Sequence, residues 1–158
     1  MKIQLDLEDL EKINLKNMSK EFILKKLDQL LKLLNELDEL LSLSFLEFKK
    51  KFTNIRSAER NFQLIVELAS DINAHIASEL GEEIPDSYRN SFLKLSKLEI
   101  LPEELVKNLI KSSNLRNILV HEYDFDEDNF IFYKSAKIFS PHYRDYIKII
   151  QKYIIKHG

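Results

Sequence analysis

The stretch Ile23–Leu41, ILKKLDQLLKLLNELDELL, decides the fold class. Its apolar residues recur at alternating steps of four and three positions, which is the spacing of one face of an α-helix: Ile23, Leu27, Leu30, Leu34, Leu37 and Leu41. Other leucines widen this stripe beyond the seam of a coiled coil, and the pattern is too short for a long one. The stretch therefore predicts a helix that packs inside a bundle.

The chain after this stretch predicts further helices. Apolar residues at helical spacing fill Ser57–Leu80, and Gly81 suits the position that ends a helix. After a linker at Glu83–Asp86, a short helix is expected over Tyr88–Leu98. Because the sequence holds only 2 glycines and 3 prolines, it has little material for β-turns. An all-α fold is expected.

Proline and charged residues mark the expected helix ends in the second half. Pro102 suits the first position of a helix, and Glu103–Glu104 suit its positive end. This helix is expected to continue to Tyr123, where the acidic stretch Asp124–Asp128 breaks it and caps the next one. Ser140–Pro141 is then expected to act as N-cap and first position of a last helix.

An aromatic and basic segment lies between the first two long helices. Phe45, Phe48 and Phe52 surround Lys49–Lys51. The spacing predicts an amphipathic turn whose rings pack inward while the lysine stems reach solvent. A patch that binds a membrane surface is the alternative, and it is the less favoured one because the inward packing needs no partner.

Length and composition fit a single soluble domain over residues 1–158. The sequence has no cysteine, which excludes disulfides, cysteine zinc sites and thiol nucleophiles. No stretch approaches the roughly 18 apolar residues of a membrane span, and the first residues do not resemble a signal peptide, so a cytoplasmic protein is expected. With a net charge of -2, any contact with RNA must be local.

Two groups of histidine-containing residues are candidates for a site. His75 follows Glu67 and Asp71 at steps of four, which places all three on one helix face. A metal site is conceivable there, but an ion-paired helix face is favoured, and no metal site is expected. His142 lies beside Pro141 at the expected start of a helix and His157 lies in the C-terminal tail, and neither has a local catalytic companion.

His121 is different because Arg116, Asn117 and Tyr123 lie close to it. At about 100° per residue, these four positions span less than half of the helix circumference. Metal-free RNA cleavage needs a base for the 2′-hydroxyl, an acid for the leaving 5′-oxygen and positive charge at the phosphate, which histidine and arginine supply. Since each chain offers one such histidine, a symmetric dimer is a hypothesis that provides both proton-transfer groups.

The whole string Arg116–Tyr123, RNILVHEY, resembles the Arg, four to six residues, His motif of HEPN ribonucleases, in the form typical of HepT-like toxins. Ala58–Gln63, AERNFQ, with the acidic positions that follow it, is similar to the second helix of that family. The resemblance covers about Leu27 to Tyr153. The first 20 residues or so look like an N-terminal extension relative to the family.

The resemblance implies an up-and-down helical bundle that forms a homodimer, with the active site in the dimer cleft. It implies a metal-independent endoribonuclease toxin, without cofactor, that is encoded beside an MNT nucleotidyltransferase antitoxin. Arg116 would stabilise the phosphate, His121 would perform acid-base catalysis and Asn117 would assist. Tyr123 matches the tyrosine that the antitoxin modifies with AMP. Supporting residues matched to acidic family positions are Glu67 and Asp71, which would orient Arg116 or form a surface ion pair.

Two other functions stay open from the sequence. One is a noncatalytic HEPN module that binds a nucleotide or docks a nucleotidyltransferase, and the other is a purely structural helical dimer. The acidic residues of Glu122–Asp128 would repel RNA unless they face away from the motif. Lys107, Lys111 and Arg144 are the nearest cations that could offset them.

Overall fold

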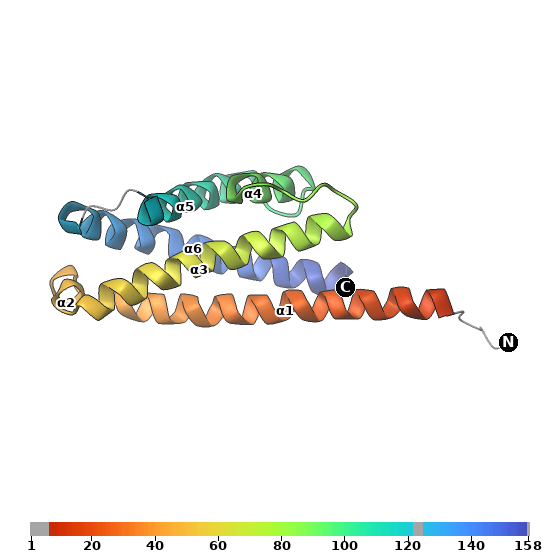
Figure 1. The fold of residues 1–158 in the computed structure, drawn as a ribbon, viewed down its shortest axis with the longest axis horizontal. Helices are drawn as coiled ribbons and strands as arrows, with labels where there is room; N and C mark the ends of the chain where they lie inside the picture. The colour runs from red at the N-terminus through yellow and green to blue at the C-terminus, as the bar shows by residue number, and fades with distance from the viewer. Residues whose placement is uncertain (1–6, 122–124, 158) are drawn as a thin grey trace.

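The computed structural model describes residues 7–121 and 125–157, with the side chains of residues 10–17 and 119–128 excepted. This part of the chain contains six α-helices and no strand, and the helices run up and down along a common long axis (Figure 1). The expected all-α bundle is confirmed. The helices are α1 (Leu7–Leu41), α2 (Phe45–Lys50), α3 (Phe52–Glu79), α4 (Tyr88–Lys97), α5 (Glu103–His121) and α6 (Phe125–His157).

The leucine stripe of α1 forms one wall of the core, as its spacing predicts. The six residues of the stripe, from Ile23 to Leu41, are all buried, and α1 packs against α3 and α6. The helix is longer than expected, because it begins at Leu7 and includes most of the residues that the sequence indicated as an extension. Figure 1 shows this first part of α1 projecting beyond the other helices.

The segment between α1 and α3 only partly follows the prediction. Ser44 caps α2 by accepting a hydrogen bond from the Glu47 backbone N–H at 3.2 Å, and Phe48 is fully buried as expected. Phe52 is 62% exposed, so the expectation that it packs inward is wrong. The reason is that α3 begins at Phe52, before the expected start at Ser57, which turns this ring toward solvent.

None of the helices, over the residues that the structure describes, combines the length and the apolar character that crossing a membrane requires.

The same backbone motif ends α3 and α4. Gly81 has a φ of 76° and follows the last turn of α3, and the Glu82 N–H donates to the Ala77 carbonyl at 2.9 Å. Glu99 has a φ of 60° after the last turn of α4, and the Ile100 N–H donates to the Leu95 carbonyl at 2.9 Å. Both are Schellman endings, so the predicted role of Gly81 is confirmed.

The prediction that Ser140 and Pro141 begin a new helix is wrong. Pro141 lies inside the continuous helix α6. The Ser140 hydroxyl forms a short hydrogen bond with Asp38 of α1 instead of capping a helix, and Arg144 Nε donates to the same carboxylate at 3.0 Å. Packing on both sides of the proline, including fully buried Tyr143, holds the helix together despite the missing N–H.

Buried polar contacts join the helices around Tyr146. Its hydroxyl lies 2.6 Å from Asn73 Oδ1 and 3.0 Å from the Ala69 carbonyl oxygen, which connects α6 to α3. Asn73 also donates to the Ser91 hydroxyl of α4 at 3.2 Å. Burial raises the pKa of Tyr146 well above its ordinary value, since an ionised hydroxyl would lose the solvation it has in water. These contacts fix the spacing of α3, α4 and α6.

Candidate functional site

Arg116 of α5 lies inward, toward α3. Its Nη2 atom donates to Glu67 Oε1 at 2.7 Å, and the two side chains are 16% and 31% exposed. A charge-assisted hydrogen bond in such a shielded position is stronger than a bond between exposed groups, because water competes less for both partners. The structure therefore fixes the guanidinium against one carboxylate of the neighbouring helix.

Tyr88, the first residue of α4, covers the guanidinium from another side. The Arg116 guanidinium carbon lies 4.9 Å from the centre of the Tyr88 ring, which is within cation-π range. Burial raises the pKa of Tyr88; the nearby Arg116 lowers it, while Glu67 and Asp71 raise it. Three helices, α3, α4 and α5, thus meet at one arginine.

The remaining predicted site residues lie along the end of α5 or beyond it. Asn117 is exposed next to Arg116. His121 is the last residue of α5, one helical turn after Asn117, and its side chain is outside the described part. Tyr123 lies outside the described residues altogether. The structure therefore places Arg116, Asn117 and the backbone of His121 on one helix.

Asp71 and His75 have contacts separate from Arg116. Asp71 is 60% exposed at its side chain and lies 3.7 Å from Lys26 of α1. The His75 ring lies 4.6 Å from the Phe22 ring, and its Nε2 forms a short hydrogen bond with the Ser19 hydroxyl. Over the described residues, no three His, Asp or Glu side chains are grouped in a way that could hold a metal ion. This face of α3 is used to attach α1.

Sequence reasoning missed the contact that Tyr88 makes with the site. The sequence indicated Tyr88 only as part of a short helix. No sequence pattern relates Tyr88 to Arg116, which lies 28 positions later. Arg144 was expected to offset acidic charge near the motif, but its Nη2 donates to Asp38 at 2.5 Å and to Asn35 at 2.9 Å. Arg144 therefore serves the packing of α6 on α1.

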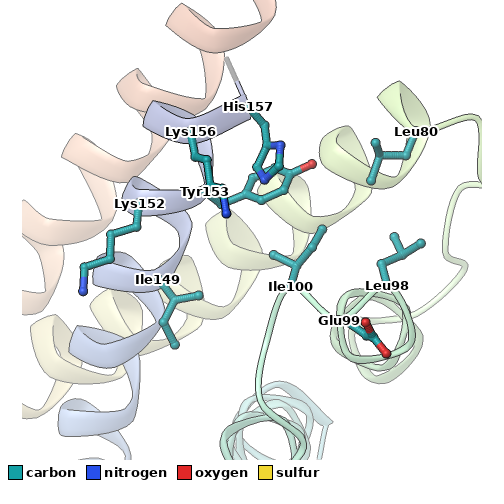
Figure 2. A pocket seen from close by; sticks show the side chains of 9 residues that line it. All are labelled: Leu80, Leu98, Glu99, Ile100, Ile149, Lys152, Tyr153, Lys156 and His157. Atoms are coloured by element: carbon teal, nitrogen blue, oxygen red, sulfur yellow. The ribbon is translucent and has the colours of Figure 1, made fainter.

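A separate pocket of about 440 Å³ lies at the other end of α5. Figure 2 shows that side chains from the ends of α3 and α6 and from the connection between α4 and α5 line it, with the rings of Tyr153 and His157 side by side. These two rings are 4.7 Å apart between their centroids. Because Ile100 precedes α5 whereas His121 ends it, the length of the helix separates this pocket from the candidate site.

Comparisons with known proteins identify the family of this chain. Residues 30–152 match the family model described as Ribonuclease HepT-like. A tRNA nuclease HepT of Aphanizomenon flos-aquae is 35% identical over 141 residues, which is 88% of this chain and 94% of that protein. An mRNA nuclease HepT of Shewanella oneidensis is 39% identical over 77 residues, which is 49% of this chain and 58% of that protein.

A solved structure has the same fold. It is the tri-AMPylated Shewanella oneidensis HEPN toxin in complex with MNT antitoxin, with a TM-score of 0.74 and 27% identity. The match covers 82% of this chain and 96% of that toxin. The family model spans the whole of α3, α4 and α5, which together hold Arg116. The chain therefore belongs to the Ribonuclease HepT-like family of HEPN proteins.

Proposed function

We propose that this protein is a metal-independent endoribonuclease, the toxin of a pair with a nucleotidyltransferase antitoxin. The observation that carries the proposal is the position of Arg116. It lies on the same helix as His121, and its guanidinium is held by Glu67 of α3 and Tyr88 of α4. The names of the relatives, tRNA nuclease and mRNA nuclease, support RNA as the substrate class. The neighbour in complex with MNT antitoxin supports the pairing.

The chemistry requires two proton transfers and one stabilised anion. The ribose 2′-oxygen attacks the phosphorus, a neutral imidazole accepts the 2′-hydroxyl proton, and the bond from phosphorus to the 5′-oxygen breaks. An imidazolium donates a proton to the departing 5′-oxygen. In the proposed homodimer, the His121 residues of two chains share these roles in a cleft between the subunits, and Asn117 helps to orient the phosphate.

Arg116 supplies the positive charge at the phosphate. Its Nε atom is buried and has no hydrogen-bond partner among the described residues. A buried donor without an acceptor is destabilising, so this guanidinium gains stability when a small shift lets it reach a phosphate oxygen. Because Glu67 occupies only one side of the guanidinium, other donors are left for the phosphate.

Modification of Tyr123 is the proposed means of control. In the tri-AMPylated toxin of Shewanella oneidensis, AMP groups are attached to the toxin. Tyr123 stands two positions after His121. Transfer of AMP from ATP to its hydroxyl, with release of pyrophosphate, adds bulk and negative charge, which would exclude an RNA phosphate from the cleft.

The proposal is tested by RNase assays of the purified protein in EDTA. Wild type is compared with Arg116→Ala, with His121→Ala and with His142→Ala, which changes a histidine of α6 outside the site. We expect the first two variants to lose about 10²-fold to 10⁴-fold in rate, and His142→Ala to keep wild-type activity. Circular dichroism checks that each variant is folded.

Two results would contradict the ribonuclease assignment, and a third would contradict the role of Tyr123. Wild-type protein that cleaves no RNA would favour a noncatalytic HEPN module that docks a nucleotidyltransferase. Equal activity in wild type and in both site variants would indicate a contaminating nuclease. For Tyr123, neutralisation of Tyr123→Phe through AMP transfer to another residue would overturn its assignment.

A further inference from the structure

A groove of about 540 Å³ lies between α4 and α5, which pack side by side (Figure 1). Its floor is apolar: Val106 and Ile110 of α5 are buried, and Leu93 of α4 is half-buried. Because Val106 and Ile110 are almost fully covered, the floor shapes the groove, and the side chains of the rim are the ones that can contact a ligand.

The rim of this groove is positively charged. It carries Arg89 and Lys97 of α4 and Lys107 and Lys111 of α5, and Glu103 is the one carboxylate among its lining residues. Lys107 lies 3.3 Å from a carboxylate oxygen of the neighbouring Glu104. Among the described residues, none is a hydrogen-bond or ion-pair partner of the other three cations. In a chain with a net charge of -2, such a cluster gives one surface a local attraction for anions.

The groove leads toward the proposed catalytic residues. Ile110 and Asn114 line it, and Asn117 and His121 follow at steps of three and four positions. Residues at these steps lie on one face of a helix, so the face of α5 that lines the groove also carries Asn117 and His121. At about 1.5 Å per residue, His121 lies about 16 Å beyond Ile110 along the axis. A bound chain that follows this face reaches the motif.

We propose that the α4–α5 groove binds the sugar-phosphate backbone of the RNA substrate on one side of the cleaved bond. This inference rests on the proposed ribonuclease function and adds the path of the substrate. Lys97 and Lys111 bind phosphates by charge. Arg89 binds a further phosphate of the strand nearer to the end of α5 that carries Arg116. The groove explains how a protein of acidic pI attracts RNA locally.

The charge of the rim favours RNA over a second copy of this chain. Two copies that met through this groove would bring like charges together, which is unfavourable at short distance. A protein partner would need a concentrated acidic surface to match it. RNA supplies one negative charge per nucleotide, which matches the cationic rim.

The test compares two pairs of substitutions that remove the same charge. The groove pair is Lys97→Gln with Lys111→Gln, and the control pair is Lys25→Gln with Lys148→Gln, two exposed lysines outside the groove. Both pairs are made in a His121→Ala background, so that binding is measured without cleavage. The probe is a fluorescently labelled single-stranded RNA of mixed sequence, and binding is followed by anisotropy at several salt concentrations.

We expect the groove pair to weaken binding about tenfold at low salt and to reduce the slope of log K against log salt by about 1.4. The control pair should leave both values near those of the background. In protein with intact His121, the groove pair should raise KM for long RNA and leave cleavage of a dinucleotide unchanged, because a dinucleotide does not extend along the groove.

The outcomes separate this inference from the proposed function. If cleavage depends on Arg116 and His121 but the groove and control pairs bind RNA equally, the groove is not the RNA-binding surface. The proposed ribonuclease function is then unaffected. Loss of affinity for the antitoxin or a change in oligomeric mass, with unchanged RNA binding, would identify the groove as a protein interface and also overturns it. Absence of any such cleavage in wild type is instead a failure of the proposed function.

Discussion

At the scale of single residues, Arg116 is held by two different forces. Glu67 attracts it through a hydrogen bond of 2.7 Å, and the guanidinium carbon lies over the Tyr88 ring, 4.9 Å from the ring centre. A cation that is held by a hydrogen bond from one side and by an aromatic ring from another has little freedom to move. Such an arginine is already oriented before a phosphate arrives, which reduces the cost of ordering it during the reaction.

Glu67 is therefore expected to act as a positioning residue. Glu67→Ala removes the acceptor for Nη2 and should lower kcat about 10²-fold, because misplacement of a catalytic group by about 1 Å has an effect of this size. Glu67→Gln keeps an oxygen acceptor and should retain most of kcat. Steady-state kinetics on a defined RNA would measure both, with KM reported separately.

The matched control for Glu67 is Asp71→Asn. Asp71 lies one turn further along α3 and pairs with Lys26 instead of Arg116, so its substitution should leave kcat unchanged. If Glu67→Ala and Asp71→Asn have equal kinetics, Glu67 is only part of a surface ion pair and the positioning role is rejected. Thermal unfolding of each variant separates a kinetic effect from loss of folded protein.

Sequence reasoning reached part of this site. The residues of the motif are neighbours along one helix, so their common face follows from helical periodicity, and Glu67 came from the resemblance of the second helix to the family. The Tyr88 contact could not be predicted, because it depends on how α4 packs against α5. Contacts between residues far apart in sequence arise from packing and leave no periodic signal.

At the scale of helices, the endings of α3 and α4 allow a paired comparison. Both have a residue with positive φ after the last turn, but one is Gly81 and the other is Glu99. Glycine adopts this conformation at no steric cost, whereas a residue with a side chain pays about 1 kcal/mol or more. Near Gly81, an added methyl group would meet no atom within 4 Å, so a substitution there affects stability only through the backbone conformation.

Opposite effects on stability are therefore expected at the two positions. Gly81→Ala should lower the free energy of unfolding by about 1 kcal/mol, and Glu99→Gly should raise it by roughly 0.5 kcal/mol after the added freedom of the unfolded chain is counted. Urea unfolding followed by circular dichroism measures both. Lower stability for Glu99→Gly would mean that the Glu99 side chain contributes more than its backbone conformation costs.

Local signals failed at Pro141 for a reason that belongs to this scale. Serine followed by proline is a good helix start when the neighbouring residues are free to turn. Here Ser140 and Arg144 both bind Asp38, and Tyr143 is buried between them, so the chain on both sides of the proline is held against α1. Local signals also failed at the start of α1. The residues before Ile23 lack the regular apolar stripe, yet they continue the helix.

At the scale of the whole molecule, the leucine, isoleucine and aromatic spacing was sufficient to predict an all-α bundle and most of its helices. Periodicity reports which face of each helix is buried, and the buried core contains the expected residues of α1 and α3. It does not report which surfaces meet another chain. The proposed dimer therefore depends on the chemistry of His121, of which each chain supplies one at the motif.

A subunit-mixing experiment tests whether two chains build one site. Wild type is mixed with the double variant Arg116→Ala with His121→Ala, and the subunits are exchanged by unfolding and refolding them together. If each active site needs the motifs of both chains, only dimers of two wild-type chains cleave RNA. Activity then falls as the square of the wild-type fraction, to about one quarter in an equal mixture.

Independent sites give a different value. If each chain cleaves RNA with its own motif, an equal mixture keeps about one half of the activity, which is also the value for a mixture that has not exchanged. Tagged wild-type chains that capture the variant verify exchange, and light scattering gives the mass of the assembly. Half activity after verified exchange would mean that His121 of one chain performs both proton transfers in turn, and the shared cleft would have to be abandoned.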